Sequence, residues 1–396
     1  MKDRFLAVLA HEADRVDPSL FSERSPGRLV PVSTVRDVAH AFVPDLLPAS
    51  WTWPNDLWPL LLEAHQCLSS LDGTGRHLQN PELVLGPLQN REAQKSSSLE
   101  GTYTDPQEQL LFALDPREGD SREDPVNARR EVFNYTRALR LRRERKDLPL
   151  SLRLIRELHH ALMDGVRGSE RAPGEFRRLQ NQIGRPARFV PPPANELASL
   201  LDNFEKYLHA ADQLDPLVRA FVAHYQFEAI HPFMDGNGRV GRLLLAVTIA
   251  EWCGLANQWL YMSDYFDRNK DTYIDRLFAV SARGDWVAWI AFCLRGVVEQ
   301  ARDTLRRYER LIELNRDFHD RVNALGVSAR YSRIIDELFL SPVMRVTRAR
   351  DLTGVTYPTA RSDLRTLERI GILTQMRGQA RITYVCLPIV EIVYAD

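Results

Sequence analysis

The sequence is poor in cysteine. It contains 4 cysteines in 396 residues, and no two of them have the CxxC spacing of a metal or redox site. Cys67, Cys253, Cys293 and Cys386 are scattered, and most of them stand among apolar residues. This arrangement argues against a disulfide framework and against a zinc site, and it favours buried free thiols in a reducing compartment.

Long apolar runs and a surplus of charge are also missing. No stretch is long and apolar enough to cross a membrane. The apolar run at residues 5–10 is too short, and too closely followed by charges, for a signal peptide. The formal net charge is −1, so the whole-chain field gives no reason to expect nucleic acid or a membrane surface as a partner. We therefore expect a cytoplasmic protein without a membrane partner.

What the chain does have is the length and composition of globular domains. Hydrophobic residues make up 44% of it and charged residues 27%, and 396 residues are enough for two or three domains. The order of the predicted helices and strands divides the chain into an N-terminal helical region at residues 1–110, a central domain at 111–318 and a small C-terminal domain at 319–396.

The most informative stretch runs from His231 to Arg242 and reads His-Pro-Phe-Met-Asp-Gly-Asn-Gly-Arg-Val-Gly-Arg. It lies between two apolar helical runs, so it predicts a loop followed by the start of a helix. Pro232 disfavours continuation of the first helix, and Gly236 and Gly238 allow a tight turn and the close approach of a ligand to the backbone. The unpaired N–H groups and the positive dipole at a helix start form a cradle for an anion, above all for phosphate.

Four side chains complete the chemistry of this stretch. Arg239 and Arg242 are three residues apart, so both guanidinium groups can point along one helix face and clamp phosphates. Asp235 supplies the hard oxygen ligand that Mg²⁺ needs. His231 has an ordinary pKa near neutrality, which suits a general base. Together they predict transfer of a phosphate-containing group, whereas a plain turn with solvated arginines would leave their combination unexplained.

This stretch resembles the signature of Fic-domain proteins, HPFx[D/E]GNGRxxR, at every defined position. The resemblance implies a mainly α fold, with a helical core and a β-hairpin flap. It also implies transfer of AMP from Mg-ATP to the hydroxyl of a Ser, Thr or Tyr residue in a protein. The central domain at 111–318 would then be the Fic catalytic domain.

The resemblance also assigns roles within the signature. His231 would take the proton of the hydroxyl group that attacks the α-phosphorus, and Asp235 would hold Mg²⁺. The other phosphate contacts would come from the backbone of Gly236 and Gly238, the side chain of Asn237, Arg239 at the β-phosphate and Arg242 at the γ-phosphate.

A second motif ends a predicted N-terminal helix, which starts near Pro87 and stops at Gly101. Glu100 would lie at the negative end of this helix, a position that favours a cationic partner. Ser96, Glu100 and Gly101 match the inhibitory motif (S/T)xxxE(G/N) of Fic proteins. The resemblance pairs Glu100 with Arg242, which would keep that arginine from the γ-phosphate. The alternative is an exposed glutamate at a Ser-rich helix end.

The segments around these motifs are predicted mainly as helices. Residues 1–50 are predicted to be an irregular arm that contains proline. Apolar periodicity predicts a helix over 57–71, and Asp72-Gly73 predicts a turn after it. Further helices are expected over 126–143 and 148–163.

Residues 171–193 change character, because proline and glycine interrupt them repeatedly. Helix is disfavoured there, and a short strand pair is expected. The segment resembles the Fic flap, which positions the backbone of the target protein beside the histidine. A plain surface hairpin is the alternative interpretation.

The segments after the signature are again helical. Residues 243–252 are apolar on nearly every side and predict a buried central helix. Tyr273 lies on a helix predicted over 267–277, and a similar segment of the family lies near the nucleotide base and sugar. Tyr273 is therefore a candidate for that contact, although a tyrosine of the core or rim is an equal reading. Residues 287–314 predict a long helix that connects two domains.

The C-terminal residues predict a separate winged-helix module. Its elements are helices over 331–340, 346–352 and 358–370 and strands over 372–376 and 381–386. Residues 328–386 contain 10 arginines and 5 acidic residues. Arg361 and Arg365 share one helix face, and Arg377 and Arg381 flank the expected wing tip. Contact with DNA and docking of a protein, including a second copy of this chain, remain equal alternatives.

The prediction is therefore a Fic-type protein adenylyltransferase that Glu100 inhibits. Its substrates would be ATP with Mg²⁺ and a protein that offers a hydroxyl group. Two alternatives stay open. Glu100 would orient water for AMP removal in a bifunctional or de-AMPylating enzyme, or the Fic core would sense nucleotide in a winged-helix transcriptional regulator.

Overall fold

The structure is a computed structural model that describes residues 17–33, 38–49, 52–78, 80–121, 124–166, 172–184, 188–211, 213–326 and 329–395. Helices dominate these residues, and the strands form two small antiparallel sheets, which confirms the predicted mainly α class. No helix within the described ranges combines the length and apolarity needed to cross a membrane. The apolar run at residues 5–10 lies outside the described residues.

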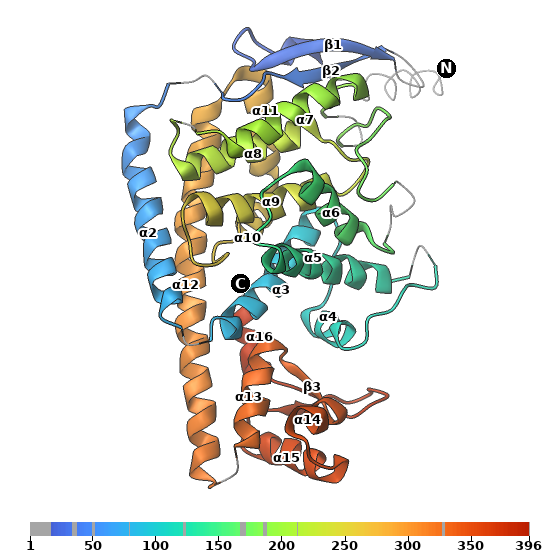
Figure 1. Cartoon of the computed structure of the whole chain (residues 1–396), viewed down its shortest axis with the longest axis vertical. Coiled ribbons are helices and arrows are strands. Elements are labelled where there is room, and N and C mark those ends of the chain that lie inside the picture. The colour runs from blue at the N-terminus through green and yellow to red at the C-terminus, as the bar shows by residue number, and fades with distance from the viewer. Residues whose placement is uncertain are drawn as a thin grey trace, which may run out of the picture.

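The N-terminal segment is not an irregular arm, and that prediction is wrong for its described part. Strands β1 (Gly27–Ser33) and β2 (Val38–Pro44) form an antiparallel pair at one end of the molecule (Figure 1). The backbone N–H of Phe42 also donates to the carbonyl of Val190, at 2.9 Å. Proline in these residues suggested irregular structure, but Pro31 lies on the outer strand of a two-stranded sheet, where its missing N–H costs little.

Two long helices run side by side along the molecule, α2 (Trp58–Arg76) and α12 (Trp286–Ala324) (Figure 1). The turn predicted at Asp72-Gly73 is wrong, because both residues lie within α2. Asp72 Oδ1 accepts hydrogen bonds from the indole of Trp259 at 3.0 Å and from the backbone N–H of Ala256 at 2.8 Å. These contacts, which come from remote sequence, hold the helix through residues that locally favour a turn.

Helix α3 (Glu82–Leu99) starts five residues before the expected position, so Pro87 lies inside it. The residue before Pro87 is Gly86, which has no Cβ to clash with the proline ring, and this lowers the cost of helical backbone there. The end of α3 is as predicted: Gly101 has φ +83 and its N–H donates to the carbonyl of Ser98 at 2.8 Å.

The central bundle places α9 in the middle of the core. Its helices are α4 (Pro106–Ala113), α5 (Val126–Glu144), α6 (Leu152–Met163), α7 (Leu197–His209), α8 (Pro216–Ile230), α9 (Asn237–Trp252), α10 (Ser263–Arg268) and α11 (Lys270–Arg283). Nearly all of α9 is buried, which confirms the predicted central helix. Its neighbour α8 is capped by Asp215, whose carboxylate accepts from the N–H of Leu217 at 2.9 Å.

The strand pair predicted over 171–193 is reduced, in its described part, to one bridge between Ile183 and Phe189. Hydrogen bonds from side chains hold the segment in place, instead of a ladder of backbone hydrogen bonds between two strands. The Gln180 amide donates to the carbonyl of Pro191 at 2.8 Å, and Arg177 donates to that of Pro192 at 2.5 Å. Such side-chain bonds to backbone groups compete with regular sheet structure.

The C-terminal module packs beneath α3 (Figure 1). Its elements are α13 (Arg330–Leu340), β3 (Val343–Arg345), α14 (Val346–Thr353), α15 (Tyr357–Arg369), β4 (Thr374–Gln375), β5 (Thr383–Val385) and α16 (Leu387–Tyr394). The expected helices and both expected strands are present. Strand β3 and helix α16 were not predicted, and the sheet order is β3-β5-β4. Helices α13 and α16 both contact α3.

Candidate functional site

The loop from His231 to Gly236 joins α8 to α9 and is pinned by a side chain. His231 ends α8 in the left-handed region, with φ +50, and Gly236 precedes α9 with φ +75. The Asn237 side chain accepts from the N–H of Phe233 and donates to its carbonyl, both at 2.8 Å. Both polar atoms of Asn237 thus bond within the loop, so this side chain shapes the loop.

We expect the Asn237→Ala variant to lose about 1–3 kcal/mol of unfolding free energy, because it leaves the buried N–H and carbonyl of Phe233 without their partner. Urea unfolding of the two proteins measures the difference. Asn323→Ala is the control, since Asn323 is exposed on α12. An equal loss in both variants would show that the loop bonds do not stabilise the fold.

The start of α9 is occupied by a carboxylate. A side chain at Gly238 would overlap Glu100 Oε1, so the glycine allows this carboxylate to reach the helix N-terminus. An anion is stabilised there by the N–H groups and the dipole. The Glu100 carboxylate therefore lies where a phosphate cradle was predicted.

Arg242 is bound by the end of α3. Its Nε donates to Ser96 Oγ at 2.9 Å, and its Nη2 donates to the Ser96 carbonyl and to Glu100 Oε1, each at 2.8 Å. The Arg242 side chain is 3% exposed, but that of Glu100 is 40% exposed. The contact between the two predicted motifs is thus present, and Glu100 is the partner that can turn away into solvent.

Both members of this pair are charged. Burial on its own would raise the pKa of the Glu100 carboxyl, but the Arg242 guanidinium, with help from Arg239 and His231, holds it below its ordinary value. Burial opposes the charge on Arg242, yet Glu100 raises the pKa of Arg242 above the ordinary value. The pair is therefore an ionised carboxylate beside a guanidinium.

His231 is held by an arginine that the sequence analysis did not single out. Arg177 Nε donates to the carbonyl of His231 at 2.9 Å, and its backbone N–H donates to that of Pro232 at 2.8 Å. Burial, and then the charge of Arg177, lower the pKa of His231 to about 4. The imidazole is therefore neutral at physiological pH, which is the form a general base needs. No local signal marked Arg177 apart from other arginines of its segment.

Arg239 is also paired, with a residue that sequence reasoning missed. Its Nη1 lies 3.2 Å from Glu131 Oε2 on α5, and both side chains are almost fully buried. Thr102 donates to the same oxygen at 2.9 Å. Glu131 lies in a regular amphipathic helix, so its sequence carries no sign of this contact.

A second missed residue, His159 on α6, shapes the loop at Asp235. The N–H of Gly174 donates to Nδ1 of His159 at 2.8 Å, so Nε2 carries the proton and donates to the carbonyl of Asp235 at 3.0 Å. The ring also stacks on Phe233, with centroids 3.8 Å apart. Asp235 Oδ1 accepts from the N–H of Gly236 at 2.8 Å.

Tyr273 on α11 lines a cavity together with His231 and Arg242. Its hydroxyl is 2.9 Å from Nε2 of His224, and its ring stacks on Phe266 with centroids 4.4 Å apart. Tyr273 is thus part of the aromatic core as well as of the cavity wall. The cavity has a volume of about 190 Å³ and brings together Glu100, His231, Gly238, Arg242, Lys270 and Tyr273 with mainly apolar residues of α8 and α11 and with Ile183 and Phe189.

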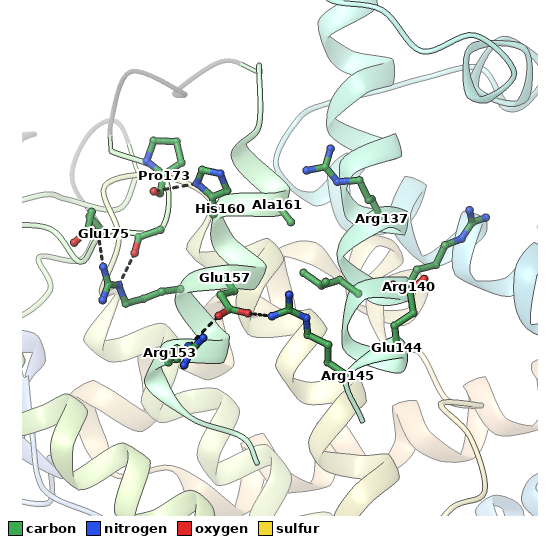
Figure 2. A pocket seen from close by; sticks show the side chains of 13 residues that line it. Arg137, Arg140, Glu144, Arg145, Arg153, Glu157, His160, Ala161, Pro173 and Glu175 are labelled. Atoms are coloured by element: carbon green, nitrogen blue, oxygen red, sulfur yellow. Dashed lines mark hydrogen bonds and ion pairs between the residues drawn. The ribbon is translucent and has the colours of Figure 1, made fainter. Parts of the chain in front are cut away.

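A larger and more open cavity of about 710 Å³ lies between α5 and α6 (Figure 2). Arginine side chains line it, but their charges are largely compensated. Arg145 and Arg153 both pair with Glu157, and Arg156 pairs with Glu175 (Figure 2). The smaller cavity differs in this respect, because Glu100, the partner of Arg242, is partly exposed and can turn away into solvent.

Known proteins match segments that contribute residues to the smaller cavity. Residues 149–249 match the Fic/DOC family, and residues 58–142 match its N-terminal part. The protein adenylyltransferase Fic of Drosophila grimshawi is 42% identical over 100 residues, and that of Drosophila persimilis is 41% identical over 100 residues. These matches cover 25% of this chain and 20% and 19% of those proteins, so the similarity spans about a fifth of the length of these curated relatives.

Two solved structures resemble the fold over much of this chain. A Fic family protein from Desulfovibrio desulfuricans G20 has a TM-score of 0.57 and 20% identity, over 86% of this chain and 98% of that one. Fic-1 from C. elegans has a TM-score of 0.50 and 20% identity, over 65% of this chain and 72% of that one. At this level of identity the likeness concerns the fold, and it confirms the predicted helical core.

Proposed function

We propose that this chain, whose residues 149–249 match the Fic/DOC family and whose residues 58–142 match the N-terminal region of that family, is a Fic/DOC protein adenylyltransferase. It would transfer AMP from ATP to the hydroxyl of a Ser, Thr or Tyr residue in a protein. The curated relatives are named for this activity. The proposal rests on one observation in particular: a neutral histidine, a helix start and a buried arginine converge on one cavity.

His231 supplies the base in the proposed reaction. Its Nδ1 lies 3.3 Å from the carbonyl of Glu228, so a proton on Nδ1 leaves Nε2 as the basic nitrogen. Nε2 accepts the proton of the hydroxyl group as the hydroxyl oxygen bonds to the α-phosphorus. The bond from the α-phosphorus to the bridging oxygen breaks, and pyrophosphate leaves with the electron pair.

The start of α9 holds the phosphates. The N–H groups of residues 236–238 stabilise their negative charge, and Arg242 binds the γ-phosphate once Glu100 has left it. Arg239 is assigned to the β-phosphate and would have to share or exchange its present contact with Glu131. Tyr273 remains a candidate for contact with the base or sugar, because it lies in the cavity wall.

Asp235 fits a Mg²⁺ ion that ATP brings with it. Among the described residues no cluster of three or more His, Cys, Asp or Glu side chains is arranged for a metal. Mg²⁺ is commonly held by one or two carboxylates together with substrate phosphates, and Asp235 stands next to the phosphate cradle. When bound, the ion would neutralise part of the phosphate charge.

Glu100 inhibits the proposed enzyme by occupying the phosphate site. Its carboxylate takes both the helix start and the guanidinium of Arg242, which are the two groups that a γ-phosphate needs. Ser96 holds the same guanidinium from the side, and the turn at Gly101 places Glu100 after the last residue of α3.

Labelled-nucleotide transfer tests the function directly. The wild type and the Glu100→Gly variant are incubated with ATP, UTP, GTP or CTP, and intact mass is read for the enzyme and for proteins of a cell extract. We expect one added AMP with ATP, more strongly in the variant. Lack of transfer from all four nucleotides would reject the proposal, and preference for another base would correct it.

We also infer that residues 319–396 form a winged-helix domain, an assignment that the order of helices and strands from α13 to β5 supports. Its partner is DNA or a protein. A gel-shift series with random and genomic DNA separates the two. Sequence-selective binding that persists at physiological salt supports DNA, and only weak, salt-sensitive binding supports a protein partner.

A further inference from the structure

A buried carboxyl group beside His231 has no role in the reaction described so far. Glu228 lies in the last turn of α8, three residues before His231, and its side chain is 12% exposed. Its Oε1 is buried, and no hydrogen-bond partner for this atom exists among the described residues. The side chain also lines the cavity that holds Arg242 and Glu100. A buried carboxyl with an unused oxygen is costly, so a functional role is the natural explanation.

The geometry ties this carboxyl to the histidine. Oε2 of Glu228 lies 4.0 Å from Nδ1 of His231, and the Glu228 carbonyl lies 3.3 Å from the same nitrogen. Gly241 on α9 leaves the space that the carboxyl fills, because a side chain there would overlap Oε1. Glu228 is thus confined between α8 and α9, within a small torsional change of a hydrogen bond to the imidazole.

Burial and neighbouring charges shift the pKa values of both members of this pair. Burial raises the pKa of Glu228 to about 7. The charge of Arg242 lowers this pKa, and the charge of Glu100 raises it. Burial and Arg177 lower the pKa of His231, whereas Glu100 and Asp235 raise it. The groups that face the pair are Arg242 from α9, Glu100 from the end of α3, Tyr273 and Lys270 from α11, and Arg177 and Asp235 from the adjoining loops.

We propose that Glu228 is a positioning residue for His231. Its carboxylate accepts a hydrogen bond from Nδ1–H, which orients the ring, keeps Nε2 unprotonated before reaction and stabilises the imidazolium once Nε2 has taken the proton of the acceptor hydroxyl. The inference rests on the proposed adenylyl transfer and adds a second protein group to its base. Glutamate, rather than a smaller or neutral residue, is needed because the imidazolium forms in a buried place.

The test compares Glu228→Gln and Glu228→Asp, each combined with Glu100→Gly so that inhibition does not mask the effect. Glutamine keeps the shape and removes the charge, and aspartate keeps the charge. We expect Glu228→Gln to lower kcat at least about tenfold with little change in the KM for ATP, since an opposite charge at this distance shifts a pKa by about one unit or more. Glu228→Asp should recover part of the loss. Glu144→Gln, on the surface of α5, is the control.

The pH profile separates positioning from a merely structural role. The acidic limb of kcat/KM reports the protonation of the coupled pair. Loss of the carboxylate makes the imidazole easier to deprotonate, so the limb should move to lower pH by about one unit or more in Glu228→Gln and stay in place in Glu228→Asp. A structural defect would lower activity without moving the limb.

Three outcomes would overturn the inference: an unchanged kcat, a kcat loss without movement of the acidic limb, or a rise confined to the KM for ATP. The last would make Glu228 a nucleotide-binding residue. If the Glu100→Gly parent itself transfers no nucleotide, the proposed function fails instead. An NMR titration of the histidine rings then still decides the contact, since Glu228→Gln must lower the pKa of His231 if the carboxylate faces Nδ1.

Discussion

Replacing His231 is expected to remove AMP transfer. Among the described residues near the phosphate cradle, Glu100 is an ionised partner of Arg242 and His159 is committed through both ring nitrogens to Gly174 and Asp235, so neither can replace His231 as the base. A general base contributes about 10²–10⁴ in rate. We therefore expect His231→Ala, in the Glu100→Gly background, to transfer at least about a hundredfold more slowly, with nucleotide binding retained in calorimetry.

The backbone at His231 calls for a second variant. Its φ of +50 is unfavourable for alanine, so a loss of activity in His231→Ala alone does not separate the missing base from strain in the loop. His231→Asn avoids this, since asparagine accepts the left-handed region and is no base at neutral pH. Both variants should be inactive while His209→Ala, an exposed position at the end of α7, stays active. Transfer by either His231 variant would reject the proposed mechanism.

The second large effect is activation by Glu100→Gly. The variant removes the carboxylate from the start of α9 and from Arg242, and it leaves both available to a γ-phosphate. A hydrogen bond to a charged group is worth about 1.5 kcal/mol or more, which corresponds to about tenfold. We expect at least that increase in AMP transfer, measured as initial rate at sub-saturating ATP.

Two further variants show whether charge is the cause. Glu100→Gln keeps the length of the side chain and a weaker hydrogen bond to Arg242, so its rate should fall between those of the wild type and Glu100→Gly. Glu144→Gly, at the exposed end of α5, should leave the rate unchanged. A wild-type rate in Glu100→Gly would remove Glu100 from the inhibitory role, and equal activation in Glu144→Gly would assign the effect to helix loosening.

Much of the site was predictable because its chemistry is local in sequence. The loop, the helix start and the residues from His231 to Arg242 follow one another, so spacing alone places them together. The end of α3 at Gly101 follows from the same local rules. The pairing of Glu100 with Arg242 was expected from resemblance to Fic proteins, since no spacing rule joins residues so far apart.

The errors have a common physical origin. Asp72 looks like a turn residue until Trp259 supplies a partner for its carboxylate, and Pro87 looks like a helix start until Gly86 is seen to relieve the clash. The β1–β2 pair resembled an irregular arm because proline interrupts it. In each case a contact or a neighbour outweighed the intrinsic preference of the residue.

By itself the sequence determined which chemical groups stand at the signature: a histidine, a carboxylate, a glycine-containing helix start and two arginines. Only the tertiary structure decided how they are held. Arg177, His159, Glu131 and Glu228 come from separate helices and loops, and no periodicity marks them. Burial then sets their protonation, because desolvation and neighbouring charges exist only once the chain has folded.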